Sequence, residues 1–243
     1  MLWSPYAPPC RGAGESVFPR GGRAERPKPA REGPGVVGRR PRILQRVRLI
    51  LVRHGLSEWN AGGLVQGQAD PPLSPEGREE ARRLAPLVRA EAPEAVVSSD
   101  LARARETAEL LEAGPVEADP RWRESAMGDW TGRSAAELFA DPSGAFARWR
   151  EGLERPPGGE SFEELRERAG AAVGDLVARG LRCAVVVTHG GPVRAAVAEL
   201  AGLAPWSLVP VPNACMTVVE TDSGRIRAFA VRPPSLARAR ADA

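Results

Sequence analysis

The chain has 243 residues, enough for one large domain or two small ones, and its 42% hydrophobic and 27% charged residues are ordinary globular usage. No segment approaches the run of about 18 apolar residues that a membrane-spanning helix needs, so a membrane span is excluded. Residues 1–46 hold ten basic and three acidic side chains, which leaves 24 basic and 28 acidic ones for residues 47–243, and this acidic balance argues against a nucleic-acid-binding domain.

Residues 1–46 are rich in proline and glycine, with eight prolines and seven glycines and no periodicity. Such a composition buries too little apolar surface to offset the entropy lost on ordering, so we predict a disordered leader. Three interpretations stay open: a solvated tail, a weak organelle-targeting peptide, or a start codon assigned upstream of the true one. The tail and the false start are favoured, because transit peptides are usually serine-rich and amphipathic.

The pattern changes at residue 47, where the apolar run VRLILV predicts a buried strand that ends at Arg53-His54-Gly55. Ser74 and Pro75 predict the start of a helix that extends to about residue 90, because serine caps helices and proline suits their first position. The next expected elements are a strand at 95–99 and a helix at 100–112, which Gly114-Pro115 ends.

The second half of the chain again alternates helices with apolar strands. The expected elements are short helices near 134–140 and 143–151, a loop at 156–161, a helix from a Ser161 cap to about residue 179, a strand at 183–189, a helix at 192–201, strands near 215–221 and 225–231, and a loose tail at 232–243. Alternating strands and helices, with strands that are apolar on both faces, predict an α/β sandwich with a largely parallel sheet.

The two histidines of the chain, His54 and His189, each follow an apolar strand and stand next to glycine and a helix start. Ligands of open α/β sheets bind at this edge, so we expect both histidines in one crevice. Two histidines make a histidine-based metal cage improbable, and we predict no metal and no cofactor. Cys10, Cys183 and Cys215 have no metal-type spacing, so a disulfide framework is improbable and a cytoplasmic location is the default.

Six motifs follow one another along the chain. They are LVRHGLSEWN (51–60), QGQADPPLSPEG (66–77), SSDLARARETA (98–108), RWRESAMGDWTG (121–132), GGES (158–161) and VVVTHGGPVRA (185–195). With these motifs, about residues 47–220 resemble a histidine phosphatase of the phosphoglycerate mutase-like superfamily. The resemblance implies a three-layer α/β/α sandwich with a mostly parallel central sheet, and a histidine phosphatase domain over residues 47–231.

The residue types in these motifs suit phosphoryl transfer. An imidazole that attacks phosphorus must be unprotonated, and neighbouring cations lower its pKa by disfavouring the imidazolium. Arg53 stands beside His54, and Arg103 lies in the first turn of the expected helix after the second strand. Guanidinium groups also match the geometry of phosphate oxygens. His189 adds a donor, and Gly190 offers a backbone N–H at a helix start.

The resemblance assigns a role to each of these residues. It implies that His54 becomes phosphohistidine, while Arg53, Arg103 and His189 form the phosphate pocket. Asn60 matches a family residue that also donates to the phosphate. Glu124 matches the family's acid/base glutamate, which protonates the leaving oxygen and later activates water. Gln66 and Gly67, in the second motif, are our candidates for substrate binding.

The chain departs from the family pattern at two places. Leu56 stands where glutamate or glutamine usually follows the RHG motif, which bears on the substrate more than on catalysis. The mutases carry a cationic, tyrosine-containing stretch after the acid/base glutamate, whereas residues 125–130 contain no basic residue. The stretch resembles the phosphatase branch, in which Gly-x-Trp follows that glutamate.

We therefore expect a phosphomonoesterase that hydrolyses a small phosphorylated metabolite, a sugar phosphate or a phosphoglycerate-type ester, through phosphohistidine. The alternatives are a 2,3-bisphosphoglycerate-dependent phosphoglycerate mutase and an inactive phosphate-binding regulatory domain. The expected partner is the small phosphorylated substrate, without nucleic acid or membrane, and a homodimer is possible.

Overall fold

The computed structural model describes residues 46–233. The leader predicted at 1–46 and the tail predicted at 232–243 lie outside these residues, except for Arg46 and positions 232 and 233. The description below concerns the unit that contains residues 43–243.

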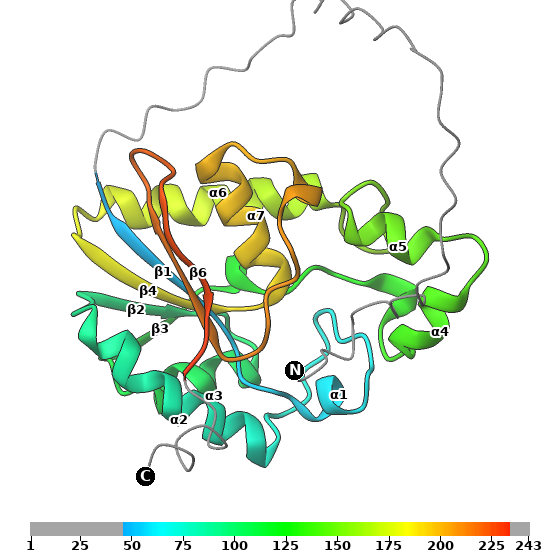
Figure 1. Cartoon of the computed structure of the whole chain (residues 1–243), viewed down its shortest axis with the longest axis horizontal. Coiled ribbons are helices and arrows are strands. Elements are labelled where there is room, and N and C mark those ends of the chain that lie inside the picture. Colours follow the sequence, from blue (N-terminus) through cyan, green and yellow to red (C-terminus); the bar gives the residue numbers. More distant parts are fainter. Residues whose placement is uncertain (1–45, 234–243) are drawn as a thin grey trace, which may run out of the picture. The chain divides into compact units, whose positions relative to one another are not determined.

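A six-stranded sheet forms the centre of this unit (Figure 1). Its strands are β1 (Arg48–Arg53), β2 (Ala95–Ser98), β3 (Val116–Ala118), β4 (Cys183–Thr188), β5 (Cys215–Glu220) and β6 (Ile226–Val231). Their spatial order is β3-β2-β4-β1-β5-β6. The first four are parallel to one another, and β5 and β6 complete the sheet as antiparallel strands.

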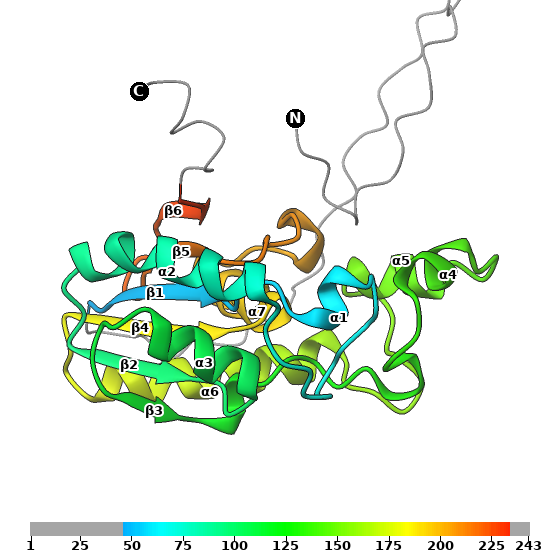
Figure 2. The ribbon, with the colours of Figure 1, turned by 90° about the horizontal axis from the view of Figure 1, so that it is seen from below.

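Helices cover both faces of the sheet, so the predicted three-layer α/β/α sandwich is confirmed (Figure 2). The α-helices are α1 (Glu58–Ala61), α2 (Pro75–Ala90), α3 (Ala102–Leu110), α4 (Ala135–Ala140), α5 (Ala145–Arg150), α6 (Phe162–Ala178) and α7 (Gly190–Ala201). Short 3₁₀ turns lie at Pro120–Trp122, Gly128–Trp130 and Pro205–Ser207. α2 and α3 pack on one face, and α6 and α7 pack on the other.

The apolar strands supply both cores because successive side chains of a strand point to opposite faces. In β1, Leu49 and Leu51 belong to the core under α6 and α7. Ile50 and Val52 belong to the core under α2 and α3. A strand that is buried on both faces therefore reads as a continuous apolar run, as the sequence indicated.

The predicted helix starts are confirmed by their caps. Ser74 Oγ accepts the Gly77 N–H at the start of α2, with Pro75 in the first helical position. Ser161 and Glu164 form a capping box at the start of α6. Each cap satisfies backbone N–H groups that have no partner inside the helix.

Several details differ from the sequence prediction. β3 and α1 were not expected, because β3 is a three-residue edge strand that is largely exposed and α1 has a single turn. α7 begins at Gly190, two residues before the predicted start, since two glycines gave no sign of helix. The helix expected at 100–112 is α3, which covers residues 102–110.

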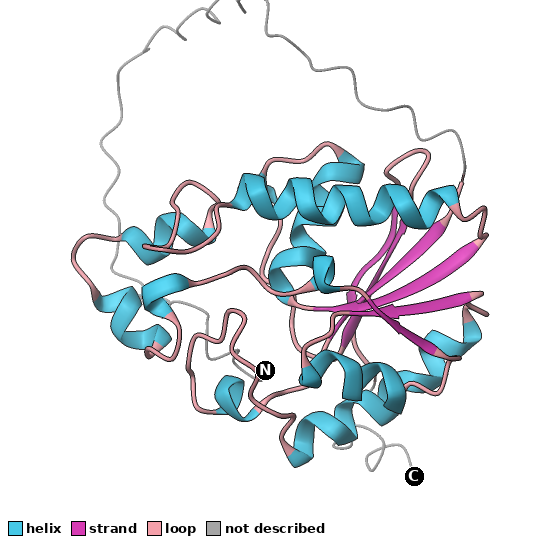
Figure 3. Cartoon of the chain, turned by 180° about the vertical axis from the view of Figure 1, so that it is seen from behind, coloured by secondary structure: helices cyan, strands magenta, loops and turns pink. Residues whose placement is uncertain are grey.

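The parallel strands end at one edge of the sheet, and the loops at this edge contain both histidines. His54 directly follows β1, and His189 directly follows β4. Figure 3 shows the strands converging toward this end, with the short helices of the 135–150 segment beyond it.

Candidate active site

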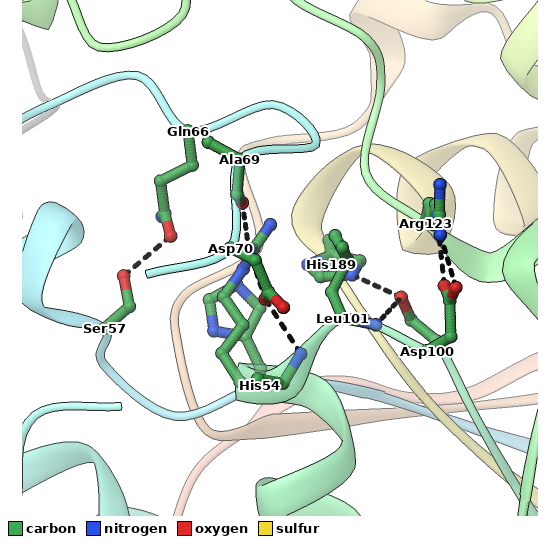
Figure 4. A network of polar contacts seen from close by, with 12 residues as sticks. His54, Ser57, Gln66, Ala69, Asp70, Asp100, Leu101, Arg123 and His189 are labelled. Atoms are coloured by element: carbon green, nitrogen blue, oxygen red, sulfur yellow. Dashed lines mark hydrogen bonds and ion pairs between the residues drawn. The ribbon is translucent and has the colours of Figure 1, made fainter. Parts of the chain in front are cut away.

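The two histidines lie side by side because β1 and β4 pair in register. Arg53, the last residue of β1, is opposite Thr188, the last residue of β4. The next residue of each strand is a histidine, and the ring centroids of His54 and His189 are 5.0 Å apart. Both side chains are buried (Figure 4).

A backbone carbonyl determines which nitrogen of His54 is free. Nδ1 lies 2.7 Å from the Gly55 carbonyl oxygen, which can only accept a hydrogen bond. Nδ1 therefore carries the proton, and Nε2 presents its lone pair. This is the arrangement that a nucleophilic imidazole requires.

The surroundings keep both imidazoles neutral. Burial holds the pKa of His54 well below its usual value, and the nearby charges of Arg103 and Arg53 lower it further. Burial and the Arg103 charge lower the pKa of His189 in the same way. A neutral His54 is a nucleophile at physiological pH without deprotonation by a separate base.

Arg103 is fully buried, and two backbone carbonyls hold its guanidinium. Nη1 donates to the Ala69 carbonyl at 2.7 Å, and Nη2 donates to the Gly67 carbonyl at 2.9 Å. Burial lowers the Arg103 pKa to about 10, so the side chain remains charged at neutral pH. The loop with Asp70 lies beside the two histidines in Figure 4.

Arg53 is fixed from the other side of the site. Its Nη1 donates to the Val211 carbonyl, which precedes β5. Gly190 lies against the same guanidinium, because a Cβ atom at Gly190 would be 3.6 Å from Arg53 Cζ. The first residue of α7 therefore packs directly on this arginine.

Three buried nitrogen atoms of this cluster have no hydrogen-bond partner within residues 46–233. They are Arg53 Nε, Arg103 Nε and His189 Nδ1. An unpaired buried N–H costs free energy on the order of 1–3 kcal/mol, so such groups are expected where a ligand accepts the bonds. Unpaired donors and two guanidinium groups around a neutral imidazole suit a phosphate ester.

Ser99 orients the second histidine. Its Oγ lies 2.9 Å from His189 Nε2 and accepts a 3.3 Å hydrogen bond from the Leu101 N–H. We infer that Ser99 donates its hydroxyl proton to Nε2, which leaves the imidazole proton on Nδ1. His189 can then donate Nδ1–H to a phosphate oxygen while it remains neutral.

Asn60 is oriented by a similar network. Its Oδ1 accepts a hydrogen bond from Asn213 Nδ2 at 3.1 Å and lies 3.1 Å from Ser57 Oγ. Asn213 Nδ2 also lies 3.1 Å from the His54 carbonyl oxygen. Because Oδ1 faces the Asn213 amide, the Asn60 side chain presents its NH₂ group on the other side, which suits donation to a phosphate.

Gln66 and Gly67 support the site through other residues. Gln66 Oε1 accepts a 2.8 Å hydrogen bond from Ser57 Oγ (Figure 4). Gly67 has φ +53° and presents its carbonyl to Arg103. A Cβ atom at Gly67 would lie 2.9 Å from the Met127 side chain, so glycine suits this position in conformation and in space.

Glu124 approaches from the loop after β3 and is held at the start of α7. Its Oε1 accepts the Gly191 N–H at 3.1 Å and the Ser125 N–H at 2.9 Å. The carboxylate also interacts electrostatically with Arg103. These two N–H donors fix one oxygen of Glu124 and thereby position its carboxylate near the cluster of His54, Arg53, Arg103 and His189.

The sequence reasoning missed Ser99, Thr107, Gly191 and Asn213 as functional positions. Thr107 Oγ1 donates to the Arg103 carbonyl and accepts the Gly55 N–H, so it links α3 to the residue after His54. Ser99 and Gly191 stand inside recognised motifs, which could have drawn attention to them. Asn213 lies outside every motif, and its sequence position gave no signal.

Comparison with known proteins identifies the family. The model of the histidine phosphatase superfamily (branch 1) matches residues 49–232. The chain belongs to this superfamily. It is accordingly a phosphomonoesterase that acts on a small phosphorylated metabolite, which confirms the reaction class expected from the sequence.

Two individual relatives and one solved structure show what the chain is similar to within this superfamily. Glucosyl-3-phosphoglycerate phosphatase of Mycolicibacterium vanbaalenii is 40% identical over 168 residues, which are 64% of this chain and 75% of that protein. A probable phosphoglycerate mutase, GpmB, of Salmonella paratyphi C is 33% identical over 66% of this chain and 78% of its own length. A solved mycobacterial glucosyl-3-phosphoglycerate phosphatase in complex with VO3 has a TM-score of 0.70 and 35% identity, over 76% of this chain and 99% of that one.

Two further observations concern residues 46–233. No helix in this range is long and apolar enough to cross a membrane. The same range contains no group of three or more histidine, cysteine, aspartate or glutamate side chains placed to hold a metal ion.

The contact between Glu124 and α7 generates the first prediction. A Cβ atom at Gly191 would lie 2.3 Å from Glu124 Oε1, so Gly191→Ala should displace the carboxylate. If Glu124 is the general acid, turnover of an alkyl phosphate should fall by about a hundredfold or more. Alanine favours helices over glycine by about 1 kcal/mol, so α7 itself is not weakened.

Gly190→Ala is the matched control, because its Cβ atom would make only ordinary contacts with Arg53. Steady-state kinetics and thermal unfolding of both variants measure the difference. Similar losses of turnover in the two variants would contradict this account of Gly191.

The second prediction concerns pH and the stability of the fold. The pKa of His54 is lower in the folded protein than in the unfolded chain, where it is about 6.5. Below pH 6.5 the unfolded chain therefore binds more protons at His54 than the folded protein does. The stability contributed by neutral His54 is therefore present above pH 6.5 and is lost as the pH falls. Between pH 7.5 and 5.5 the loss should be on the order of 1 kcal/mol.

Urea unfolding of wild type and of His54→Gln at both pH values tests this. The carboxylates titrate in both proteins, so the difference between the proteins isolates the histidine. The wild type should lose more stability on acidification than the variant, and equal losses would show that His54 titrates normally in the fold.

Proposed function

We propose that this protein hydrolyses a phosphate monoester of a sugar-linked glycerate, of the glucosyl-3-phosphoglycerate type, by transient phosphorylation of His54. The observation that carries the mechanism is the buried cluster around His54, where Arg53 Nε, Arg103 Nε and His189 Nδ1 lack partners among the residues that the structure describes. The substrate class rests on relatives that are named glucosyl-3-phosphoglycerate phosphatases.

In the first step, His54 Nε2 attacks the phosphorus atom and forms a P–N bond. The bond between phosphorus and the ester oxygen breaks, and its electron pair leaves with that oxygen. Glu124 in its protonated form gives the oxygen a proton, so an alcohol departs rather than an alkoxide. Arg53, Arg103 and His189 donate to the non-bridging oxygens, where negative charge must be stabilised throughout the transfer.

In the second step, Glu124 accepts a proton from water, and the water oxygen attacks the phosphohistidine. The P–N bond breaks, its electron pair returns to Nε2, and inorganic phosphate leaves. One carboxylate therefore serves as acid and then as base, and its proton returns within the cycle. Asn60 adds an NH₂ donor to the same phosphoryl group in both steps.

The segment after Glu124 favours hydrolysis over a mutase reaction. A mutase must hold a second anionic group and exclude water between its two half-reactions. Residues 125–130 carry no basic side chain, and Met127 and Trp130 are buried. Trp130 packs edge-on against Phe146 and Trp149, so aromatic contacts hold residues 125–130 against α5.

Two alternative functions fit these observations less well. The mutase is favoured by the relative named as a probable phosphoglycerate mutase. An inactive phosphate-binding domain is disfavoured, because Arg53, His54, Arg103, Glu124 and His189 are all present with the geometry described above. We also propose a cytoplasmic location, supported by Cys183 and Cys215, which are buried free thiols.

The function is tested by phosphate release. Purified protein should release phosphate from glucosyl-3-phosphoglycerate faster than from 3-phosphoglycerate or from nucleotide monoesters. His54→Ala should abolish both turnover and the acid-labile phosphoenzyme, because His189 is already engaged by Ser99. Rapid isomerisation of 3-phosphoglycerate in the presence of 2,3-bisphosphoglycerate, without phosphate release, would support the mutase instead.

A separate prediction concerns Glu124. Glu124→Gln should reduce phosphorylation of His54 by sugar phosphates about a hundredfold to ten-thousandfold, which is the usual value of general acid catalysis. An aryl phosphate has a leaving group that departs without a proton, so its phosphorylation step should be slowed much less.

The variant should then show a burst with the aryl ester, followed by slow turnover, because water attack still lacks its base. Rapid-quench measurements with both esters distinguish the two steps. Equal losses in the phosphorylation step, with no burst, would assign Glu124 a positioning role and make Asp129 the next candidate for the acid.

A further inference from the structure

A second group of arginines lies at the opposite end of the sheet from His54. A hollow of about 290 Å³ opens there, and we call it the arginine hollow. It is lined by Arg46, Arg48, Arg182, Glu220 and Arg227. Arg48 is the first residue of β1, and Arg182 immediately precedes β4. Six residues of strand separate this end from the histidines, or about 20 Å, so the hollow is distinct from the catalytic site.

The single carboxylate in the hollow acts as an anchor for two of its arginines. Glu220 ends β5, and its side chain is only 7% exposed. Its Oε1 accepts hydrogen bonds from Arg46 Nη2 at 2.6 Å and from Arg227 Nε. One largely covered negative charge therefore holds two guanidinium groups close together, at a separation that would otherwise be disfavoured by their repulsion.

The other two arginines are anchored from outside the hollow. Arg48 donates through Nη2 to the Glu91 carbonyl at 3.1 Å, and its Nη1 lies 3.3 Å from the Glu91 carboxylate, while its buried Nε has no partner within residues 46–233. Arg182 donates through Nε to Glu94 at 2.7 Å, while its side chain is 90% exposed. Glu91 and Glu94 do not line the hollow, but each pairs with one of its arginines, so four guanidinium groups meet three carboxylates.

We propose that the arginine hollow is a second anion site, which binds a small phosphate-type oxyanion with two or more negative charges. Planar guanidinium groups bind such oxyanions in bidentate fashion, and the four around the hollow carry one more charge than Glu220, Glu91 and Glu94 together neutralise.

This proposal does not depend on the proposed substrate. The oxyanion has two possible sources, inorganic phosphate or a phosphorylated metabolite with a further acidic group. Orthophosphate represents the first source. Phosphonoacetate represents the second, because its C–P bond is not a phosphate ester and a phosphomonoesterase does not cleave it.

Backbone amide NMR on the full chain separates this site from the catalytic site. Both ligands are titrated at constant ionic strength, with amides of Arg182 and Cys183 reporting on the hollow and amides of Gly55 and Gly190 reporting on the catalytic site. Arg182→Gln removes one charge from an exposed side chain, which spares the fold. Arg225→Gln is the matched control, since Arg225 is an exposed arginine next to β6 that does not line the hollow.

We expect saturable shifts at the hollow amides in wild type and Arg225→Gln, with dissociation constants below about 10 mM. Arg182→Gln should weaken binding there roughly tenfold and leave the catalytic-site shifts unchanged. Tighter binding of phosphonoacetate would indicate a phosphorylated metabolite, and tighter or equal binding of orthophosphate would indicate inorganic phosphate. No saturable shift at Arg182 and Cys183, or equal weakening in both variants, would overturn the proposal.

Discussion

The in-register pairing of β1 with β4 is the constraint on which the rest of the site depends. It places Arg53 opposite Thr188, and the residue that directly follows each of these strand ends is a histidine. A shift of one residue in this register would move every apolar side chain of β1 to the wrong face of the sheet. The two cores that flank the sheet thus fix the relative position of His54 and His189 as firmly as they fix the fold.

This arrangement places charge and unpaired donors in the interior. Arg103 is fully buried, and Gly67 and Ala69 satisfy only part of its donor capacity. Burial of a guanidinium with an unpaired Nε opposes folding, so the surrounding cores must supply the compensating stability. In the proposed mechanism a bound phosphate ester accepts the same N–H groups and so reverses this cost. The proposed affinity for the phosphoryl group therefore comes from donors that the fold has already desolvated and oriented.

The sequence predicted the cores and the two adjacent histidines, because both leave local signals. Continuous apolar runs indicated β1 and β4, and the RHG and THGG motifs marked the histidines. The orienting residues leave no such signal, since their partners are distant along the chain. Asn213 reaches Asn60 across 153 residues, and Ser99 reaches His189 across 90. Only the register of the sheet and the packing of the loops bring these pairs together.

Gly191 is another residue whose partner could not be predicted from the sequence. Its motif is visible, but the sequence suggested the N–H of Gly190 as the functional group. In the structure Gly190 packs on Arg53, and the Gly191 N–H holds the Glu124 carboxylate. Two adjacent glycines serve different partners because the first turn of α7 points them in different directions. A motif can therefore locate a helix start while leaving the division of roles within it to be determined by packing.

Substrate selection must be separate from the phosphate pocket. Arg53, Arg103 and His189 contact only the phosphoryl group in the proposed mechanism, so they would accept any accessible monoester. Discrimination then falls to the segment after Glu124, which lacks cations and whose Trp130 packs against Phe146 and Trp149 of α5. A segment without cations offers no charge partner to a second phosphate group. The absence of cations that disfavours mutase chemistry thus also disfavours a doubly phosphorylated substrate, and both follow from residues outside the phosphate pocket.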